Sequence, residues 1–418
     1  MNVTNERLAW WKAALRFESP FYLNMFFLYM ALSLLGKGHA AYPYILLWLW
    51  AGYGLSQARY RRLLTEAVRG RPQLGWIGGL AVLYGVINAV STLVNQGRPD
   101  AWDGWERVFA WIFCGVVGVW LAGLHPTVMI YRQFSRWQAG MLLCLSAVVV
   151  GSSLGLFSYV QLGVLDFKTK VDTIFEMLCL SVYVNVFASS NLPKRDRGLQ
   201  GAVLLAGSLG FAMGVTSRLM LPVMVFGVIL AAWMGRNRVL RWMPLVFAVL
   251  GLAALALRPE MIRSLARINL ADPLYWQVKI LNYRDIIWWL SLVMFMNHPW
   301  LGIGPGNFTA VGEATRQSIG LVDPSRQSYI HAHNLWWNPF VVCGLFGGVV
   351  HTLLMINVVR MVLGKLAWER TRPLALNLLM IWFVYQFYGL VEMAPTMEEI
   401  IPYVWGGTGL LAGMKGKG

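Results

Sequence analysis

Long apolar runs, separated by short polar or basic stretches, recur along the whole chain. Each run approaches the roughly 20 residues that a helix needs to cross a hydrocarbon core about 30 Å thick. We therefore predict an all-α polytopic integral membrane protein with about twelve transmembrane helices. The predicted spans lie near residues 20–36, 41–57, 74–94, 107–124, 138–158, 173–190, 199–215, 219–234, 242–257, 335–357, 374–391 and 400–414.

Basic residues follow every second apolar run, and this alternation predicts the orientation of the chain. Short loops rich in Lys and Arg face the cytoplasm. Both termini are then cytoplasmic, and residues 258–334 form one large periplasmic loop within a single transmembrane domain over residues 1–418. The basic clusters are Arg59, Arg61, Arg62, Arg69 and Arg71; Arg132 and Arg136; Lys194, Arg195 and Arg197; Arg236, Arg238 and Arg241; and Arg360, Lys365, Arg370 and Arg372.

The predicted periplasmic loop contains one more apolar segment, residues 286–296. Eleven residues at a rise of 1.5 Å cover only about half of the hydrocarbon core. Counting the segment as a span would also invert the orientation of the later basic loops. We predict a short helix that lies at the interface or covers the outer mouth of a cavity.

The composition agrees with a membrane protein. Hydrophobic residues make up 57% of the chain and charged residues 13%, against about 45–50% and about 25% in soluble domains. The net charge of +16 comes from clusters between apolar runs, which favours contact with anionic lipid over nucleic acid. All four cysteines lie inside apolar runs, so we predict neither a disulfide nor a metal framework, and no cofactor.

Polar residues that need a functional explanation gather on the predicted outer side. The segment 329–334 reads Tyr-Ile-His-Ala-His-Asn and ends with His331, His333 and Asn334. A histidine, whose ordinary pKa is near 6.5, can take a proton from a hydroxyl at neutral pH. The alternative is a capping or interfacial histidine. A metal site is disfavoured because no third ligand has a suitable spacing.

Residues 298–308 read His-Pro-Trp-Leu-Gly-Ile-Gly-Pro-Gly-Asn-Phe. Glycines at alternate positions, together with a proline, predict a tight turn in place of regular helix. The backbone N–H groups at Gly304 and Gly306 could then approach a ligand closely. The alternative is a chain reversal after the short helix, with no ligand involved.

Two arginines on the predicted outer side, Arg218 and Arg284, are candidates for phosphate binding. An arginine at a membrane boundary costs free energy unless it snorkels or pairs, and a guanidinium can hold phosphate oxygens with two parallel hydrogen bonds. Pairing with Asp285 is the alternative for Arg284. Among the acids before the last run, Glu392 is a candidate to orient a histidine or bind an acceptor sugar, and a solvated interfacial carboxylate is the alternative.

Together these residues resemble the superfamily of bacterial O-antigen ligases, O-antigen polymerases and protein O-oligosaccharyltransferases. The strongest element is His333-Asn334, then nine residues, then Gly344-x-x-Gly347. The Thr-Ser-Arg element at Arg218, the Arg284 element and the glycine-rich segment occur in the family's order. These motifs cover roughly residues 214–348, and the first half of the chain matches only as a hydrophobic pattern.

The resemblance implies a GT-C-like glycosyltransferase of the bacterial inner membrane, most similar to O-antigen ligases of lipopolysaccharide biosynthesis. Such an enzyme transfers polysaccharide from undecaprenyl pyrophosphate to a sugar hydroxyl of the lipid A-core on the periplasmic side. His333 would be the catalytic base, with Arg218, Arg284, His331, Asn334, Gly304, Gly306 and Glu392 binding substrate. No Asp-x-Asp pair occurs in the chain, so metal-independent transfer is expected, and attack from the face opposite the leaving pyrophosphate predicts inversion. O-antigen polymerase and a bicarbonate-transporter-like protein stay open as alternatives.

Overall fold

The computed structural model describes residues 18–35, 41–95, 103–156, 168–187, 192–214, 220–234, 271–273, 283–321, 331–390 and 400–415, in which the regular structure is entirely helical. The helices are α2 (Pro20–Leu35), α3 (Ala41–Ser56), α4 (Ala58–Arg69), α5 (Pro72–Val94), α6 (Asp103–Leu124), α7 (Thr127–Ser153), α9 (Lys168–Phe187), α10 (Lys194–Gly214), α11 (Met220–Met234), α15 (Arg284–Asn297), α16 (Phe308–Ser318), α17 (Asn338–Lys365), α18 (Arg372–Gly389) and α19 (Ile401–Gly413).

Each predicted span that falls on described residues contains a helix, so the periodicity identified the helices well. The predicted span 242–257 and most of the predicted loop before Tyr283 lie outside the described residues. By length and composition, α5, α7 and α17 are long and apolar enough to cross a membrane. The last predicted span is a 13-residue helix, α19, which is about 20 Å long and shorter than a hydrocarbon core.

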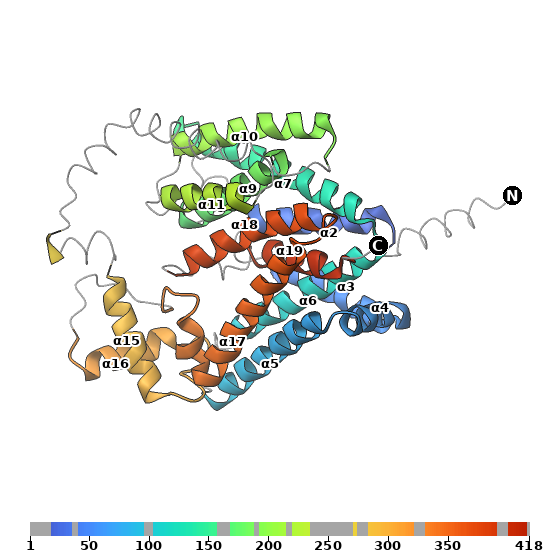
Figure 1. The fold of residues 1–418 in the computed structure, drawn as a ribbon. Coiled ribbons are helices and arrows are strands. Elements are labelled where there is room, and N and C mark those ends of the chain that lie inside the picture. The colour runs from blue at the N-terminus through green and yellow to red at the C-terminus, as the bar shows by residue number, and fades with distance from the viewer. Residues whose placement is uncertain are drawn as a thin grey trace.

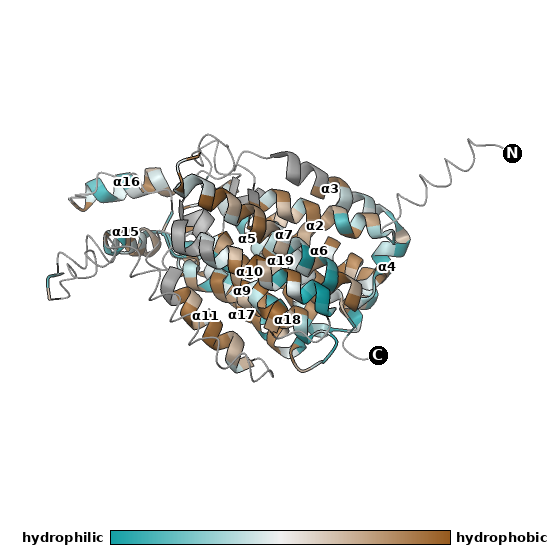
Figure 2. Ribbon diagram, turned by 90° about the horizontal axis from the view of Figure 1, so that it is seen from above, coloured by the Kyte–Doolittle hydropathy of each residue, from teal (hydrophilic) through white to brown (hydrophobic). Residues whose placement is uncertain are grey.

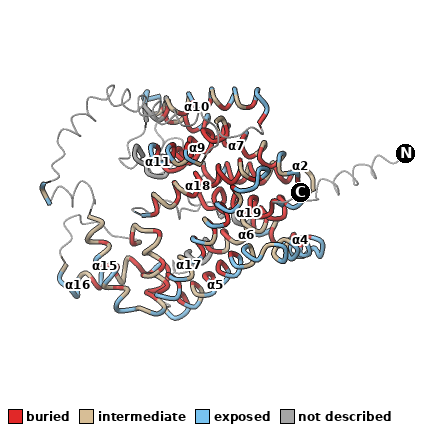
Figure 3. Tube along the Cα trace, in the orientation of Figure 1, coloured by how far each residue is buried: buried red, intermediate tan, exposed pale blue. Residues whose placement is uncertain are grey.

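Apolar side chains cover the outside of the bundle as well as its centre. On α5, Val82, Val86, Val90 and Leu93 are 40–53% exposed, a continuous stripe of a kind that a soluble monomer rarely keeps in water. Every residue of α19 is buried, and α9 and α18 are largely buried beside it (Figure 3). The exposed stripe suits contact with lipid.

The bundle has two distinct ends, which we call the α4 end and the α15 end (Figure 1). Near the α4 end, Gln73 Nε2 on α5 donates to Asn357 O on α17 (3.4 Å). Ser91 Oγ, at the opposite end of α5, donates to Val342 O (3.1 Å). The two helices are therefore antiparallel, and α15 and α16 lie beyond the start of α17, as Figure 2 also shows.

Basic side chains bind helix termini at the α4 end. Arg372 Nη2 donates to Met234 O, the last carbonyl of α11 (2.8 Å). Lys365 Nζ donates to Met414 O after α19 (2.7 Å), and Arg71 donates to Ala412 O. Two of the basic loops predicted to share one side of the membrane thus meet at one end of the bundle, beside the ends of α11 and α19.

The apolar segment that the sequence predicted to be a short helix forms part of α15. Residues 286–296 are helical, within α15, as predicted. α15 packs on α16 and on the start of α17, outside the bundle of long helices (Figure 1). The prediction of a short helix in this loop is confirmed, and its position relative to a membrane stays a prediction.

Polar residues are also buried deep in the bundle, which the sequence pattern did not indicate. Gln138 Nε2 on α7 donates to Asn377 Oδ1 (2.8 Å) and to Tyr403 OH (2.7 Å). Asn185 Nδ2 donates to Gln138 Oε1 (3.0 Å). These bonds join α7, α9, α18 and α19 and satisfy the amides inside an apolar bundle. These buried amides were not among the residues selected from the sequence.

Candidate functional site

A small hydrophobic core at the α15 end holds the candidate motifs together. It is separate from the main core of the bundle. It joins α15, the glycine-rich segment, the start of α16, the histidine segment and α17, which are distant in sequence. Its buried members are Ile287, Leu290, Met294, Ile303, Phe308, Ala332 and Val341.

The glycine-rich segment docks into a break in α17. The break is at Gly344, whose φ of 68° and ψ of −167° are not helical. On the near side, the N–H groups of Ile303 and Gly304 donate to the carbonyls of Val341 and Val342 (3.0 and 2.9 Å). Beyond the break, Leu345 N donates to Pro299 O (2.7 Å). The segment thus satisfies backbone groups that the broken helix leaves without helical partners.

Packing explains the glycines on both sides of this contact. A Cβ at Gly302 would lie 2.4 Å from Val342 C, and one at Gly344 would lie 2.2 Å from Trp300 O. Both residues also have positive φ, as do Gly304 and Gly306, a region that glycine enters without steric cost. The glycines of the two motifs therefore fit together as one structural unit.

The predicted ligand role differs between Gly304 and Gly306. Gly304 is buried, and its N–H is bound to Val342 O. The alternative interpretation, a chain reversal after the short helix, accounts for this glycine. Gly306 is exposed, so its backbone is open to a ligand. Binding at either glycine stays a prediction.

The end of α5 anchors the turn from the other side. Ser91 Oγ donates to Leu301 O (2.6 Å), and Asn95 Nδ2 donates to Gly302 O (3.3 Å). Asn307 Nδ2 in turn donates to Asn95 O (3.0 Å). Sequence reasoning missed Ser91, a polar residue within the predicted span 74–94, and Asn95, which directly follows that span.

The two histidines contact each other at the α15 end. Their ring centroids are 4.2 Å apart with an edge-to-face arrangement, and His333 N–H donates to His331 Nδ1 (3.3 Å). Both rings are partly exposed, whereas Ala332 between them is fully buried in the small core. The pair is thus fixed through its backbone and remains accessible through its rings.

The backbone is strained at His333 and next to Arg284. Within the described residues, Tyr283 (φ 60°) and His333 (φ 47°) are the only non-glycine residues with positive φ. Such a conformation costs about 1–3 kcal/mol and persists where the surroundings impose it, frequently at functional sites. Both strained positions adjoin or coincide with a residue that we selected from sequence for its chemistry.

Asn334 fixes the histidine segment to two helices. Its Oδ1 accepts from Trp336 N (2.9 Å) and Trp337 N (2.8 Å) at the turn that leads into α17. Its Nδ2 donates to Leu390 O after α18 (2.9 Å). Both ends of the amide are therefore engaged within the protein. The arrangement suits a residue that positions His333, and substrate binding by Asn334 stays a prediction.

Arg284 is the first residue of α15 and is partly buried. Ile287, one turn later on the same helical face, belongs to the small core together with Ala332. The helix that begins at Arg284 and the segment that carries the two histidines thus both contribute to the small core, and we call this core with the two segments the histidine platform. Arg218 and Glu392 lie outside the described residues. The described residues hold no group of three His, Cys, Asp or Glu side chains arranged for a metal ion.

Residues 202–352 match the model of a family described as O-Antigen ligase. A search of curated proteins finds no match. The matched range contains Arg284, the glycine-rich segment, both histidines and the break at Gly344. Residues 202–352 are therefore similar to the O-antigen ligase family, which supports the resemblance indicated by the motifs.

Proposed function

We propose that the protein is an O-antigen ligase. It transfers polysaccharide from undecaprenyl pyrophosphate to a sugar hydroxyl of the lipid A-core, without a metal ion and with inversion at the anomeric carbon. In this proposal His333 accepts the proton of the attacking hydroxyl. Arg284, with Arg218, holds the pyrophosphate leaving group, and His331 and Asn334 keep the His333 ring in place.

One observation carries the proposal: the helix that begins at Arg284 and the histidine segment meet in one small core at the α15 end of the helical bundle. Transfer from a lipid pyrophosphate needs a base for the acceptor hydroxyl and cations for the developing charge on the phosphate. The platform supplies a candidate for each. Attack from the side opposite the departing pyrophosphate gives the inverted product.

We expect Arg284→Lys to impair transfer strongly. Lysine keeps the positive charge but loses the planar fork that binds two phosphate oxygens at once. Transfer is measured with purified protein and both lipid substrates, with Arg316→Lys on α16 as a control, because Arg316 is committed to Glu313 (2.6 Å). Near-normal transfer by Arg284→Lys would refute the bidentate role. EDTA leaves wild-type transfer intact if arginine, not a metal ion, neutralises the pyrophosphate.

The proposal places the α15 end in the periplasm. In a variant without the four native cysteines, a cysteine introduced at Ser325 is then labelled from outside intact cells. One introduced at Gly70, next to α4, is protected until the membrane is permeabilised. Basic loops at the α4 end support this orientation. The reverse labelling pattern would disprove the proposed topology.

Two alternatives remain. A polymerase would join two lipid-linked glycans and leave the lipid A-core unused. A transporter is favoured by one feature that the sequence reasoning missed: the ionisable residues Glu176 and His351 are buried in α9 and α17, as in many substrate pathways. Purified protein given lipid-linked glycan and lipid A-core separates all three, because a ligase forms the joined lipopolysaccharide, a polymerase lengthens the lipid-linked glycan, and a transporter forms neither product.

A further inference from the structure

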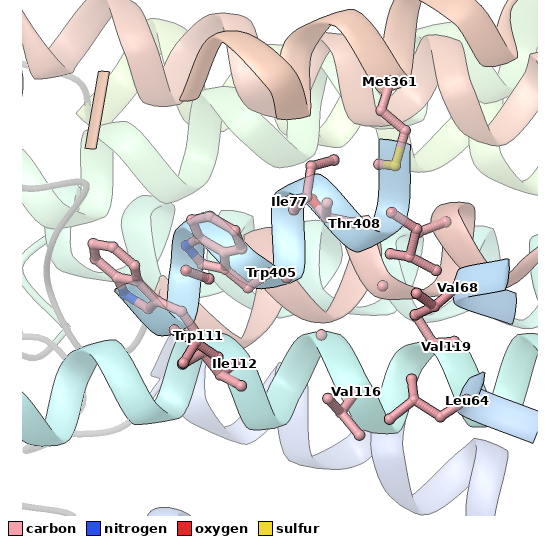
Figure 4. Close-up of a pocket in the computed structure, with 17 residues that line it drawn as sticks. Leu64, Val68, Ile77, Trp111, Ile112, Val116, Val119, Met361, Trp405 and Thr408 are labelled. Carbon is pink, nitrogen blue, oxygen red and sulfur yellow. The ribbon is translucent and has the colours of Figure 1, made fainter. Parts of the chain in front are cut away.

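A cavity of about 260 Å³ lies among α4, α5, α6, α17 and α19, away from the histidine platform. Trp111 and Trp405 close one end, and Leu64, Val68 and Met361 lie at the other (Figure 4). Side chains from α4 form part of the wall, so this second end faces the α4 end of the bundle. The cavity plays no part in the proposed transfer reaction.

The shape and lining of the cavity suit a single hydrocarbon chain. Along α6 it extends from Trp111 to Val119, which is about 12 Å at 1.5 Å per residue. Its volume is below the about 300–1,000 Å³ of pockets for drug-sized ligands. Gly78 and Gly115 line it, and a Cβ at either would meet nothing within 4 Å. The missing side chains thus create part of the space.

The cavity opens towards the outer apolar face of α5. Val82 lines the cavity and is 52% exposed, and Gly78, one turn earlier, is also exposed. Val82 belongs to the apolar stripe that faces outward from the bundle. A lipid chain can therefore enter sideways from the membrane.

Two cations lie at the α4 end of the same cavity. Arg71 donates to the carbonyl of Ala412, a lining residue. Lys365 follows the lining residue Met361 by one turn, and its Nζ donates to Met414 O (2.7 Å). The positive charges of Arg71 and Lys365 lie close enough to interact electrostatically. Two neighbouring cations repel each other, so a phosphate beside them lowers their electrostatic energy.

The flanking helix α4 has the pattern of an interfacial helix. Leu64 and Val68 line the cavity, whereas Arg62 and Arg69 are exposed. An amphipathic helix with a basic polar face lies at the level of lipid headgroups and is attracted to anionic lipids. Cations that can bind a lipid headgroup therefore lie next to a cavity that can hold its acyl chain.

We propose that this cavity is a binding site for an anionic phospholipid of the leaflet at the α4 end. One acyl chain fills the cavity, and the phosphate lies beside Arg71 and Lys365. The proposal is independent of the transferase activity, since Arg284 of the proposed transfer site lies at the opposite end of the bundle.

The test is native mass spectrometry of the full-length protein in mixed micelles. The micelles contain equal amounts of phosphatidylglycerol and phosphatidylcholine with the same acyl chains, plus undecaprenyl phosphate. We expect one phosphatidylglycerol to remain bound. Gly115→Leu fills the cavity and lowers its occupancy at least about tenfold. Gly78→Leu, from the opposite wall, does the same.

Matched controls separate the site from general effects. Gly123→Leu makes the same change on α6 but outside the cavity, at a position where a Cβ also meets nothing within 4 Å. This variant is expected to retain the lipid. Arg71→Gln and Lys365→Gln abolish the preference for phosphatidylglycerol, whereas Arg71→Lys and the exposed Arg370→Gln preserve it. Thermal unfolding checks that each variant is folded.

Three results would overturn the proposal. The first is that Gly115→Leu and Gly78→Leu both retain as much phosphatidylglycerol as Gly123→Leu does. The second is equal retention of the two phospholipids by the wild type. The third is retention of undecaprenyl phosphate in place of phospholipid, which would assign the cavity to an isoprenoid chain.

Discussion

Gly344→Ala is expected to destabilise the protein by more than about 3 kcal/mol and to abolish transfer. The φ and ψ of Gly344 (68° and −167°) belong to a region that is essentially restricted to glycine, at a cost of about 1–3 kcal/mol for other residues. The added Cβ would also lie 2.2 Å from Trp300 O, a backbone atom that cannot rotate away. The glycine-rich segment must then leave α17 and lose its three backbone hydrogen bonds.

Gly364→Ala, on the same helix, is the matched control. A Cβ at Gly364 meets nothing within 4 Å, and alanine is favoured over glycine in a helix by up to about 1 kcal/mol. Thermal unfolding in detergent and in vitro transfer measure both variants. Equal melting temperatures and equal transfer for the two variants would show that the break at Gly344 does not hold the site together.

The sequence predicted most of the helices because lipid imposes a simple rule. A spanning helix must be apolar over about 20 residues, and that pattern is visible without knowledge of the fold. The same rule conceals interior polar contacts. Gln138 and Asn377 lie in predicted spans, and only the packing of α7 against α18 shows that their amides pair.

The candidate site was predictable as a set of residues but not as an arrangement. The histidines, Arg284 and the glycines were selected for their chemistry, and the structure places them around one small core. The function of Gly302 and Gly344 could not be read from sequence, since each is required by a backbone atom on the other segment. A glycine motif indicates a backbone that can adopt unusual conformations. Whether the glycine also permits close packing depends on the segment that it contacts.

The anchoring residues at the end of α5 show the same limit. Ser91 and Asn95 hold the glycine-rich segment through hydrogen bonds to backbone carbonyls. Such bonds need no particular side chain on the partner, so no pattern in residues 298–308 points to α5. Contacts of this kind appear only when the two segments are seen side by side.

His333→Ala and His333→Gly are expected to lose transfer by at least about 100-fold, since general-base catalysis contributes typically about 10²–10⁴ in rate. The two variants differ in stability. His333 has a φ of 47°, which alanine adopts at a cost and glycine adopts freely. The free energy of unfolding of His333→Gly is therefore about 1 kcal/mol higher than that of His333→Ala, so His333→Gly unfolds at a higher temperature although it is equally inactive.

Donor binding and pH dependence distinguish a base from a structural residue. Both His333 variants still bind the lipid-linked donor, because the phosphate contacts are assigned to arginine. A base must be unprotonated to accept a proton, so wild-type transfer falls on acidification, and the residual transfer of the variants lacks this acid limb. His331→Ala, which removes the acceptor of the His333 N–H (3.3 Å), keeps the acid limb at a reduced rate. Normal turnover by His333→Ala, together with an inactive His331→Ala, would assign the role of base to His331. A product that retains the donor's anomeric configuration would exclude the direct attack that His333 is proposed to assist.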